Sequence, residues 1–433
     1  MPVLLGELSR EALVARSRER GEPEWLTEAR AKAWEVYQSL RLPGPHDEDW
    51  RRTDVSPVRL AEVVADAPEG PAAPLPDRLR KVADSGKALV LENGVVTARP
   101  AGLPHGVIVT DLETAAREHP DLVREHLMSR VIRPDEHIFV ALHAAIWRGG
   151  VFIHVPAGVR VEEPIQTVEW AGGAGAGLFG HTLVVVEPGA EVTVAQYVGS
   201  APVPDRTVQA GAVEIWAKPG AQVRYASVQN WGTGVWSFTT RRALVQKDAR
   251  VDWLIGDFGG SLVRSEQRTV LDEPGAQGNL KLVFFGSGDQ HIDLVAEDLH
   301  VPGSHRSAGD ILGRGVLAGS ARAVFRGVGH IMRGAKGCEC FLRENALLLN
   351  RGCRVDSIPS LFIDDDDVVR GGHAATSGRV DDEELFYLRS RGIPENRAKR
   401  LIVMGFLQPL LEAAQGTGLR SEIESLIDGK LGL

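Results

Sequence analysis

His373 stands among very small residues in the stretch GGHAATSGRVDDEELFYLRSRGI (Gly371–Ile393). Because its four nearest neighbours are glycine or alanine, a metal ion or a partner molecule could approach the imidazole closely. Imidazole is the commonest metal ligand among side chains, and it titrates near neutral pH. The residues alone leave two interpretations open: a ligand presented to a metal or partner, or a histidine hydrogen-bonded in a turn.

Three cysteines are the other candidate metal ligands. Cys338 and Cys340 share one face if their stretch is a strand. Zinc and iron–sulfur sites normally use four ligands, so Cys353 and a histidine would have to join these two thiols. Buried structural thiols are the alternative, since free cysteine is among the most buried residue types. Three clustered cysteines do not form a secreted disulfide framework, which favours a cytoplasmic protein with reduced thiols.

Acidic residues supply further candidates. Asp289, His291 and Asp293 alternate along one strand and predict either a metal site or a hydrated outer wall. The acidic run IDDDDVV (Ile363–Val369) is more typical of a solvated edge that protects a β structure from pairing. GAGLFG (Gly175–Gly180) matches a dinucleotide-binding fingerprint, but a strand-like segment follows where the fingerprint requires a helix. We therefore interpret that match as accidental.

A recurring turn predicts the scaffold that positions these residues. From about Phe139, apolar residues alternate with polar ones, and the turn phrases EPGAEV, KPGAQV, QKDARV and DEPGAQG recur. Their marker residues Ala190, Ala221, Ala249 and Ala276 are spaced by 31, 28 and 27 residues, and Ser304 follows 28 residues later. A turn and an alternating strand at a near-constant period predict a parallel β-helix. A β-sandwich is the rival, but its turns usually fall every ~8–12 residues.

Helical and mixed segments flank this region. We expect an amphipathic helix starting at Pro23, a hairpin turning at Asn93-Gly94, and a helix interrupted near Pro120. Asp381 and Glu384 form a capping-box pattern at the start of the C-terminal helices. The expected division is an N-terminal helical and α/β region (1–138), a mainly β core (139–375) and a C-terminal helical domain (376–433).

Composition excludes several classes of protein. The formal net charge is −9 with no long basic block, which argues against nucleic acid or an anionic membrane as the main partner. Neither a signal peptide nor an apolar run of membrane-spanning length is apparent. An enzyme that acts on polysaccharide with a β-helix fold is an alternative, but aromatic residues are only 6% and no secretion signal is present.

Three stretches resemble the SufB/SufD family of iron–sulfur cluster assembly proteins: DEDWRRTDVS (47–56), FVALHAAIWRGGVFIHVPAGVRVEEPIQ (139–166) and CRVDSIPSLFIDDDDVVRGGHAATSGRVDDEELFYLRSRGI (353–393). The first stretch and RVDSIPSLFI resemble the SufD branch. The SufB branch has glutamate after the histidine, where this chain has Ala374, and a cysteine near the position of Glu344. The family often has a cysteine two residues before the histidine, where this chain has Gly371.

The resemblance implies a right-handed parallel β-helix and a non-catalytic scaffold subunit. It implies a heterodimer with SufB through the β-helix, a possible homodimer in isolation, and docking of the SufC ATPase, where ATP is hydrolysed, on the C-terminal helices. His373 would be an iron or cluster ligand shared at the SufB interface. No cofactor would be tightly bound by the lone chain, while iron or a cluster would be held transiently in the complex. A SufB-like cluster scaffold is the alternative. The residues expected to bind the ATPase are Leu385, Phe386, Leu388, Leu401, Phe406 and Leu410.

Overall fold

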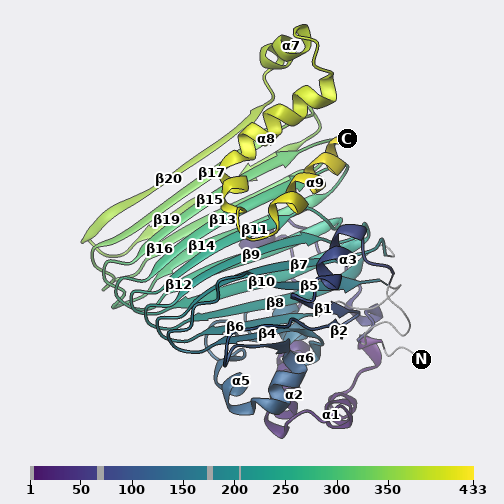
Figure 1. The fold of residues 1–433 in the computed structure, drawn as a ribbon, viewed down its shortest axis with the longest axis vertical. Helices are drawn as coiled ribbons and strands as arrows, with labels where there is room; N and C mark the ends of the chain where they lie inside the picture. Colours follow the sequence, from purple (N-terminus) through teal and green to yellow (C-terminus); the bar gives the residue numbers. More distant parts are fainter. Residues whose placement is uncertain (1–3, 66–72, 173–178, 204–205) are drawn as a thin grey trace.

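The computed structural model describes residues 4–65, 73–172, 179–203 and 206–433. Its core is a parallel β-solenoid, in agreement with the predicted β-helix. Successive strands alternate between two sheets, and most pair with the strand two places later in the chain. Figure 1 shows the coils stacked from the N-terminal helices toward β20 (Val368–Arg379), which is the last strand of its sheet.

Strands β1 to β20 form two sheets, here called the β20 sheet and the β14 sheet. Neighbouring strands are parallel except for β1 with β2 and β3 with β4. In spatial order the β20 sheet contains β2 (Val95–Ala98), β1 (Ala88–Glu92), β5 (Ile165–Ala171), β7 (Glu191–Ser200), β9 (Gln222–Asn230), β11 (Arg250–Asp257), β13 (Gln277–Gly286), β15 (Ala308–Leu317), β17 (Cys338–Leu348) and β20. The β14 sheet contains β18 (Arg354–Ser357), β16 (Arg322–Ile331), β14 (His291–His300), β12 (Leu262–Leu271), β10 (Val235–Val245), β8 (Thr207–Ala217), β6 (His181–Val186), β4 (Gly150–Val155) and β3 (Ile108–Asp111), with β19 (Ser360–Ile363) also on β16.

The recurring turn phrase forms one row of turns along the solenoid. The marker residues Ala190, Ala221, Ala249, Ala276 and Ser304 are all completely buried. Glycine precedes most of them with a positive φ, because the chain reverses there in a conformation that side chains disfavour. Two further turn phrases that resemble the recurring one, LAGSAR (317–322) and LNRGCR (349–354), interrupt its regular spacing in the sequence. They belong to the opposite row of turns, at the other ends of the strands. Two interleaved rows explain why these phrases are more closely spaced.

The strand pattern starts later than the sequence predicts. Residues 138–146 form helix α6 (Ile138–Ile146), and the first solenoid strand starts at Gly150. All nine residues of α6 are buried, so its apolar residues do not alternate with polar ones as a half-buried strand would require. The GAGLFG match lies mostly outside the described residues, and strand β6 follows it.

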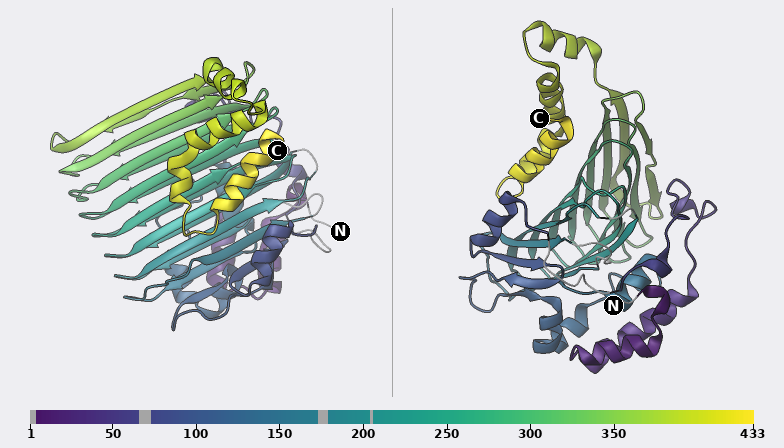
Figure 2. Two further views of the ribbon diagram at one scale, coloured as in Figure 1. Left: turned by 45° about the horizontal axis from the view of Figure 1, so that its top comes forward. Right: turned by 90° about the vertical axis from the view of Figure 1, so that its right-hand side faces the viewer.

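Helices cover both sheets. Helices α1 (Arg10–Glu19), α2 (Glu24–Ser39), α4 (Leu112–Glu118), α5 (Pro120–His126) and α6 share a core with the first coils of the β14 sheet, while α3 (Asp77–Asp84), α8 (Glu395–Ala413) and α9 (Arg420–Leu431) pack on the β20 sheet. Short 3₁₀ turns occur at Leu5–Glu7, Glu48–Trp50 and Leu60–Glu62. Figure 2 shows α8 and α9 lying along one face of the solenoid.

Several local predictions are confirmed. The hairpin turns at Asn93-Gly94, which both have positive φ, and the predicted helix is divided at Pro120. Pro23 caps its helix rather than occupying the first helical turn. The Asp381 carboxylate accepts a hydrogen bond from the Glu383 amide at 2.8 Å and so caps α7 (Asp382–Ser390).

The segment 47–56 crosses the outer face of the β14 sheet and is fixed there by a buried carboxylate. Asp293 is completely buried and accepts hydrogen bonds from Arg264, at 2.7 Å, and from Arg326. The Thr53 hydroxyl also donates to Asp293. One carboxylate therefore pairs with two guanidinium groups and joins the segment to three neighbouring strands.

Candidate metal and partner interface

His373 ends a row of side chains that fill the interior of the solenoid. Strand pairing places it beside Leu342 on β17, at the end of a row with one residue in each coil. Paired residues of parallel strands lie on the same side of the sheet, so the row marks the interior face. The other members are all buried: Ile165, Val194, Tyr225, Trp253, Leu280, Ile311 and Leu342. An exposed imidazole takes the apolar position in the last coil.

The solenoid is open at this end. Within the described residues no strand pairs with the outer side of β20, and large apolar side chains are exposed there. Phe362 is 52%, Ile363 44% and Val369 68% exposed. A Cβ atom added at Gly371 would lie 2.8 Å from the Ile363 side chain, so the β20 backbone closes tightly onto β19. The result is an unpaired strand edge and an apolar rim around His373, both of which favour association with another protein.

The side chains around His373 do not complete a metal site. Among the described residues no three His, Cys, Asp or Glu side chains are grouped so that they could hold an ion. His373 also has no hydrogen-bond or ion-pair partner in this part of the chain, so it is not the hydrogen-bonded turn histidine of the alternative interpretation. A metal held by this imidazole would need ligands from another molecule.

The structure separates the cysteines. Cys338 and Cys340 both point into the core, where the Cys338 thiol lies 3.2 Å from the Ser307 hydroxyl and burial raises the pKa of Cys340. Cys353 follows the far end of β17, on the order of 30 Å from Cys338 by the rise per residue of a strand. These thiols therefore do not form a shared metal site and have the burial expected of structural residues.

Glu344, which the resemblance aligns with a cysteine of the SufB branch, is buried in the last coils. It accepts a hydrogen bond from the Ser357 hydroxyl across the interior. Burial raises the pKa of Glu344 to about 7. A carboxyl group, not a thiol, therefore occupies this position on β17, the strand that pairs with the last strand β20.

The other acidic candidates have structural roles. Asp289 lies in a turn, while His291 and Asp293 belong to the network beneath segment 47–56, so the three do not form a metal site. The alternative of a hydrated wall is wrong at Asp293, because that segment covers it. In the acidic run, Asp365 accepts amide hydrogen bonds from Gly334 and Asp367, which hold the pKa of Asp365 below its usual range.

A buried relay of two histidines and a glutamate was not predicted from the sequence. His143 Nδ1 lies 2.9 Å from the Ala210 carbonyl, and His143 Nε2 lies 2.9 Å from His181 Nδ1. His181 Nε2 lies 3.1 Å from Glu214, and burial lowers the pKa of both histidines. A carbonyl only accepts, so each neutral ring donates through Nδ1 and accepts through Nε2. Glu214 must then donate to His181, and it is therefore protonated.

This relay predicts a pH-dependent stability. Burial raises the pKa of Glu214 to about 8, so between about pH 7 and pH 8 the folded chain keeps a proton that the unfolded chain has lost. As the pH rises through this range, this group alone is expected to lower the free energy of unfolding by up to about 1.4 kcal/mol per pH unit. Urea denaturation at the two pH values checks this. Glu214→Gln should reduce the decrease, and an identical slope in both proteins would contradict the assignment.

The C-terminal helices present an apolar surface beyond the solenoid. Helix α7 has no buried residue and projects from the body of the molecule in Figure 1. Phe386 is 72% and Leu401 50% exposed, and Tyr387, which the sequence analysis did not single out, is 56% exposed. Of the other expected docking residues, Leu385, Leu388 and Phe406 are partly buried. Leu410 packs in the core against the β20 sheet, so its side chain is not available at the surface.

Comparison with known proteins identifies the class of this β-solenoid. Residues 169–406 match the SUF system FeS cluster assembly, SufBD core domain, and residues 84–167 match the SufBD protein N-terminal region. The chain is 33% identical to the iron-sulfur cluster assembly protein SufD of Bacillus subtilis, over 98% of both chains. It is 28% identical to SufB of the same organism, over 93% of this chain and 88% of that one. The chain belongs to the SufBD family, whose members act in iron–sulfur cluster assembly.

No helix within the described ranges combines the length and the apolar character needed to span a bilayer.

Proposed function

We propose that this chain is a SufD-like scaffold subunit that works with a SufB protein and a SufC ATPase in iron–sulfur cluster assembly. The observation that carries the proposal is the position of His373, which ends the interior row at the open rim without a ligand set of its own. The buried carboxyl group of Glu344 supports the SufD branch over the alternative of a SufB-like scaffold. The SufB branch has a cysteine at this position, and its thiolate would be the cluster ligand.

The open end is the proposed contact with SufB. Its apolar rim of Phe362, Ile363 and Val369 and the unpaired edge of β20 would be covered by the partner. SufB would supply the sulfur ligands and this chain the imidazole of His373, so that iron or a nascent cluster is held between the two subunits. In the absence of SufB, the same rim would bind a second copy of this chain.

The C-terminal helices are the proposed contact with the ATPase. The exposed Phe386, Tyr387 and Leu401 form its docking surface, and ATP hydrolysis takes place in the partner. Because α8 packs directly on the β20 sheet, a displacement of α7 and α8 would be transmitted to the coils that carry His373. The chain itself performs no catalytic step in this scheme and binds no cofactor tightly.

The decisive experiment replaces His373 by alanine in the assembled complex. We expect cluster formation to fall about tenfold or more, as for other losses of metal-binding groups, while co-purification with SufB and SufC is unchanged. Iron and sulfide content and the visible absorption of the cluster measure the first effect. His105→Ala is the matched control, because His105 is an exposed histidine in the turn before β3, at the opposite end of the solenoid from this rim. Unchanged cluster formation, or loss of partner binding as well, would contradict a ligand role.

A further inference from the structure

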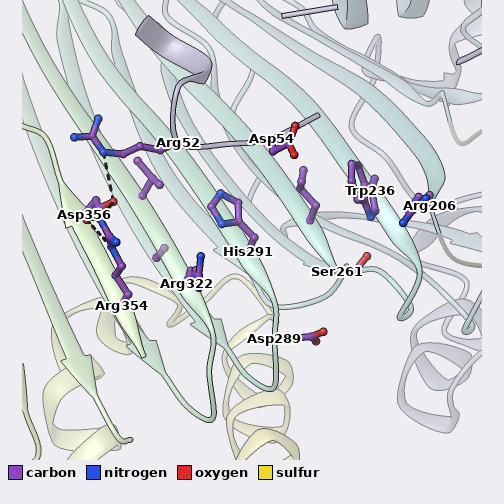
Figure 3. Close-up of a pocket in the computed structure, with 13 residues that line it drawn as sticks. Arg52, Asp54, Arg206, Trp236, Ser261, Asp289, His291, Arg322, Arg354 and Asp356 are labelled. Carbon is purple, nitrogen blue, oxygen red and sulfur yellow. Dashed lines mark hydrogen bonds and ion pairs between the residues drawn. The ribbon is translucent and has the colours of Figure 1, made fainter. Parts of the chain in front are cut away.

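A cavity of about 530 Å³ lies on the outer face of the β14 sheet, beside segment 47–56 and on the opposite sheet from His373 (Figure 3). It is formed by the starts of neighbouring strands of the β14 sheet and by Arg52 and Asp54 of the segment. Its volume is in the range of small-molecule sites. Charged and hydrogen-bonding groups line much of it, which indicates a polar ligand. Neither the iron chemistry nor the two proposed partner contacts uses this cavity.

One end of the cavity carries an excess of positive charge. Arg52 and Arg354 both contact the Asp356 carboxylate, at 3.4 and 3.1 Å. Arg322 lines the same end, and its guanidinium group has no hydrogen-bond or ion-pair partner in the described part of the chain. Three guanidinium groups and one carboxylate therefore line this end of the cavity (Figure 3), in a protein whose formal net charge is −9.

The remaining acidic groups do not neutralise this end. Asp54 forms no ion pair within the described residues; its carboxylate accepts a hydrogen bond from the Ser56 amide at 2.9 Å. Hydrogen bonds from the Ser56 side chain and amide lower the pKa of Asp54. Asp289 lies in the turn before β14, apart from the arginines in Figure 3. At the opposite end, Trp236 lies beside Arg206, whose guanidinium carbon is 6.0 Å from the indole centroid. The cavity thus has one end lined by three arginines and an opposite end lined by the indole of Trp236 and by Arg206.

His291 adds a hydrogen-bond acceptor between these ends. Its Nε2 lies 3.0 Å from the Thr53 hydroxyl, which already donates its proton to Asp293. His291 Nε2 must therefore be the donor to Thr53. Burial lowers the pKa of His291, so the ring is neutral and Nδ1 is an acceptor. A ligand that fits here has an anionic group and a hydroxyl group.

We propose that this cavity binds a small organic phosphate or diphosphate. Guanidinium groups bind phosphate oxygens through paired, charge-assisted hydrogen bonds, and the guanidinium group of Arg322 lines the cavity without a partner among the described residues. Arg52 and Arg354 would hold the phosphate from the other side, while a ligand hydroxyl donates to His291 Nδ1. The rest of the molecule would lie against Trp236. A phosphate alone would leave most of the volume empty.

Isothermal titration calorimetry of the full chain with inorganic pyrophosphate at low salt tests this site. We expect saturable binding that Arg322→Gln weakens about tenfold or more. Arg351→Gln is the matched control, because Arg351 is an exposed arginine in the turn before β18 that does not line the cavity. Circular dichroism spectra of both variants are compared with that of the wild type to check that each variant folds.

Two results would overturn the proposal. One is an absence of saturable pyrophosphate binding, or an equal loss in both arginine variants, which would show a nonspecific charge effect. The other comes from vesicle flotation with and without phosphatidic acid. Flotation that depends on Arg322, without binding of free pyrophosphate, would assign the site to a lipid headgroup instead. Binding of pyrophosphate to wild type, its loss in Arg322→Gln and its retention in Arg351→Gln support a soluble ligand.

Discussion

Replacing Asp293 by alanine is expected to lower the free energy of unfolding by about 3–5 kcal/mol, since the change leaves the buried Arg326 guanidinium without a carboxylate and leaves Arg264 with Glu266 alone. Arg264 and Arg326 would both lose the carboxylate between them, and neither reaches solvent readily, being 4% and 8% exposed in their side chains. Thr53 would lose its acceptor as well, which would weaken the attachment of segment 47–56. Urea denaturation followed by circular dichroism measures the effect.

Asp310→Ala is the matched control for this prediction. Asp310 also pairs with an arginine, Arg343, at 2.7 Å, but the two side chains are 36% and 45% exposed. An exposed pair of this kind contributes about 0–1 kcal/mol, because solvent screens both charges. Equal effects of the two substitutions would contradict the view that Asp293 anchors the segment. Hydrogen exchange at residues 47–56 should rise in Asp293→Ala only.

The solenoid could be predicted because its signal is local and repeated. Each coil needs a left-handed turn residue and a small residue that fits the interior, such as Gly189 and Ala190, and both requirements are visible in the sequence. The start of the solenoid could not be placed in the same way. The wholly apolar stretch 138–146 is compatible with a buried strand or a buried helix, and packing between α2 and the β14 sheet selects the helix.

The sites were predicted only where a local pattern marked them. Small neighbours singled out His373, but its place at the end of the interior row depends on strand register across the whole solenoid. The alternation of His291 and Asp293 was visible in the sequence. Their hydrogen bonds to Thr53 were not, because Thr53 lies 240 residues earlier in the chain than Asp293. The cavity near Arg322 and the relay of Glu214 likewise join residues that no sequence pattern connects.

The proposed ATPase contact gives the largest expected effect on assembly. The double variant Phe386→Ala, Leu401→Ala removes two exposed apolar side chains of α7 and α8. Central apolar anchors of an interface commonly contribute about 2 kcal/mol or more each, so we expect binding of SufC to weaken at least about a hundredfold. Point variants are preferable to deletion, because removing α8 and α9 would expose the apolar face of the β20 sheet that they cover.

Co-purification and surface plasmon resonance with the SufC partner measure this loss. Val95→Ala is the matched control, since Val95 is 61% exposed on β2, the antiparallel strand at the opposite edge of the β20 sheet from β20. Neither position lies at the rim around His373, so binding of SufB should be unchanged in both variants. Wild-type affinity for SufC in the double variant would remove α7 and α8 from the docking surface. A simultaneous loss of SufB would show that the change disturbs the solenoid instead, because the two contacts lie on different parts of the fold.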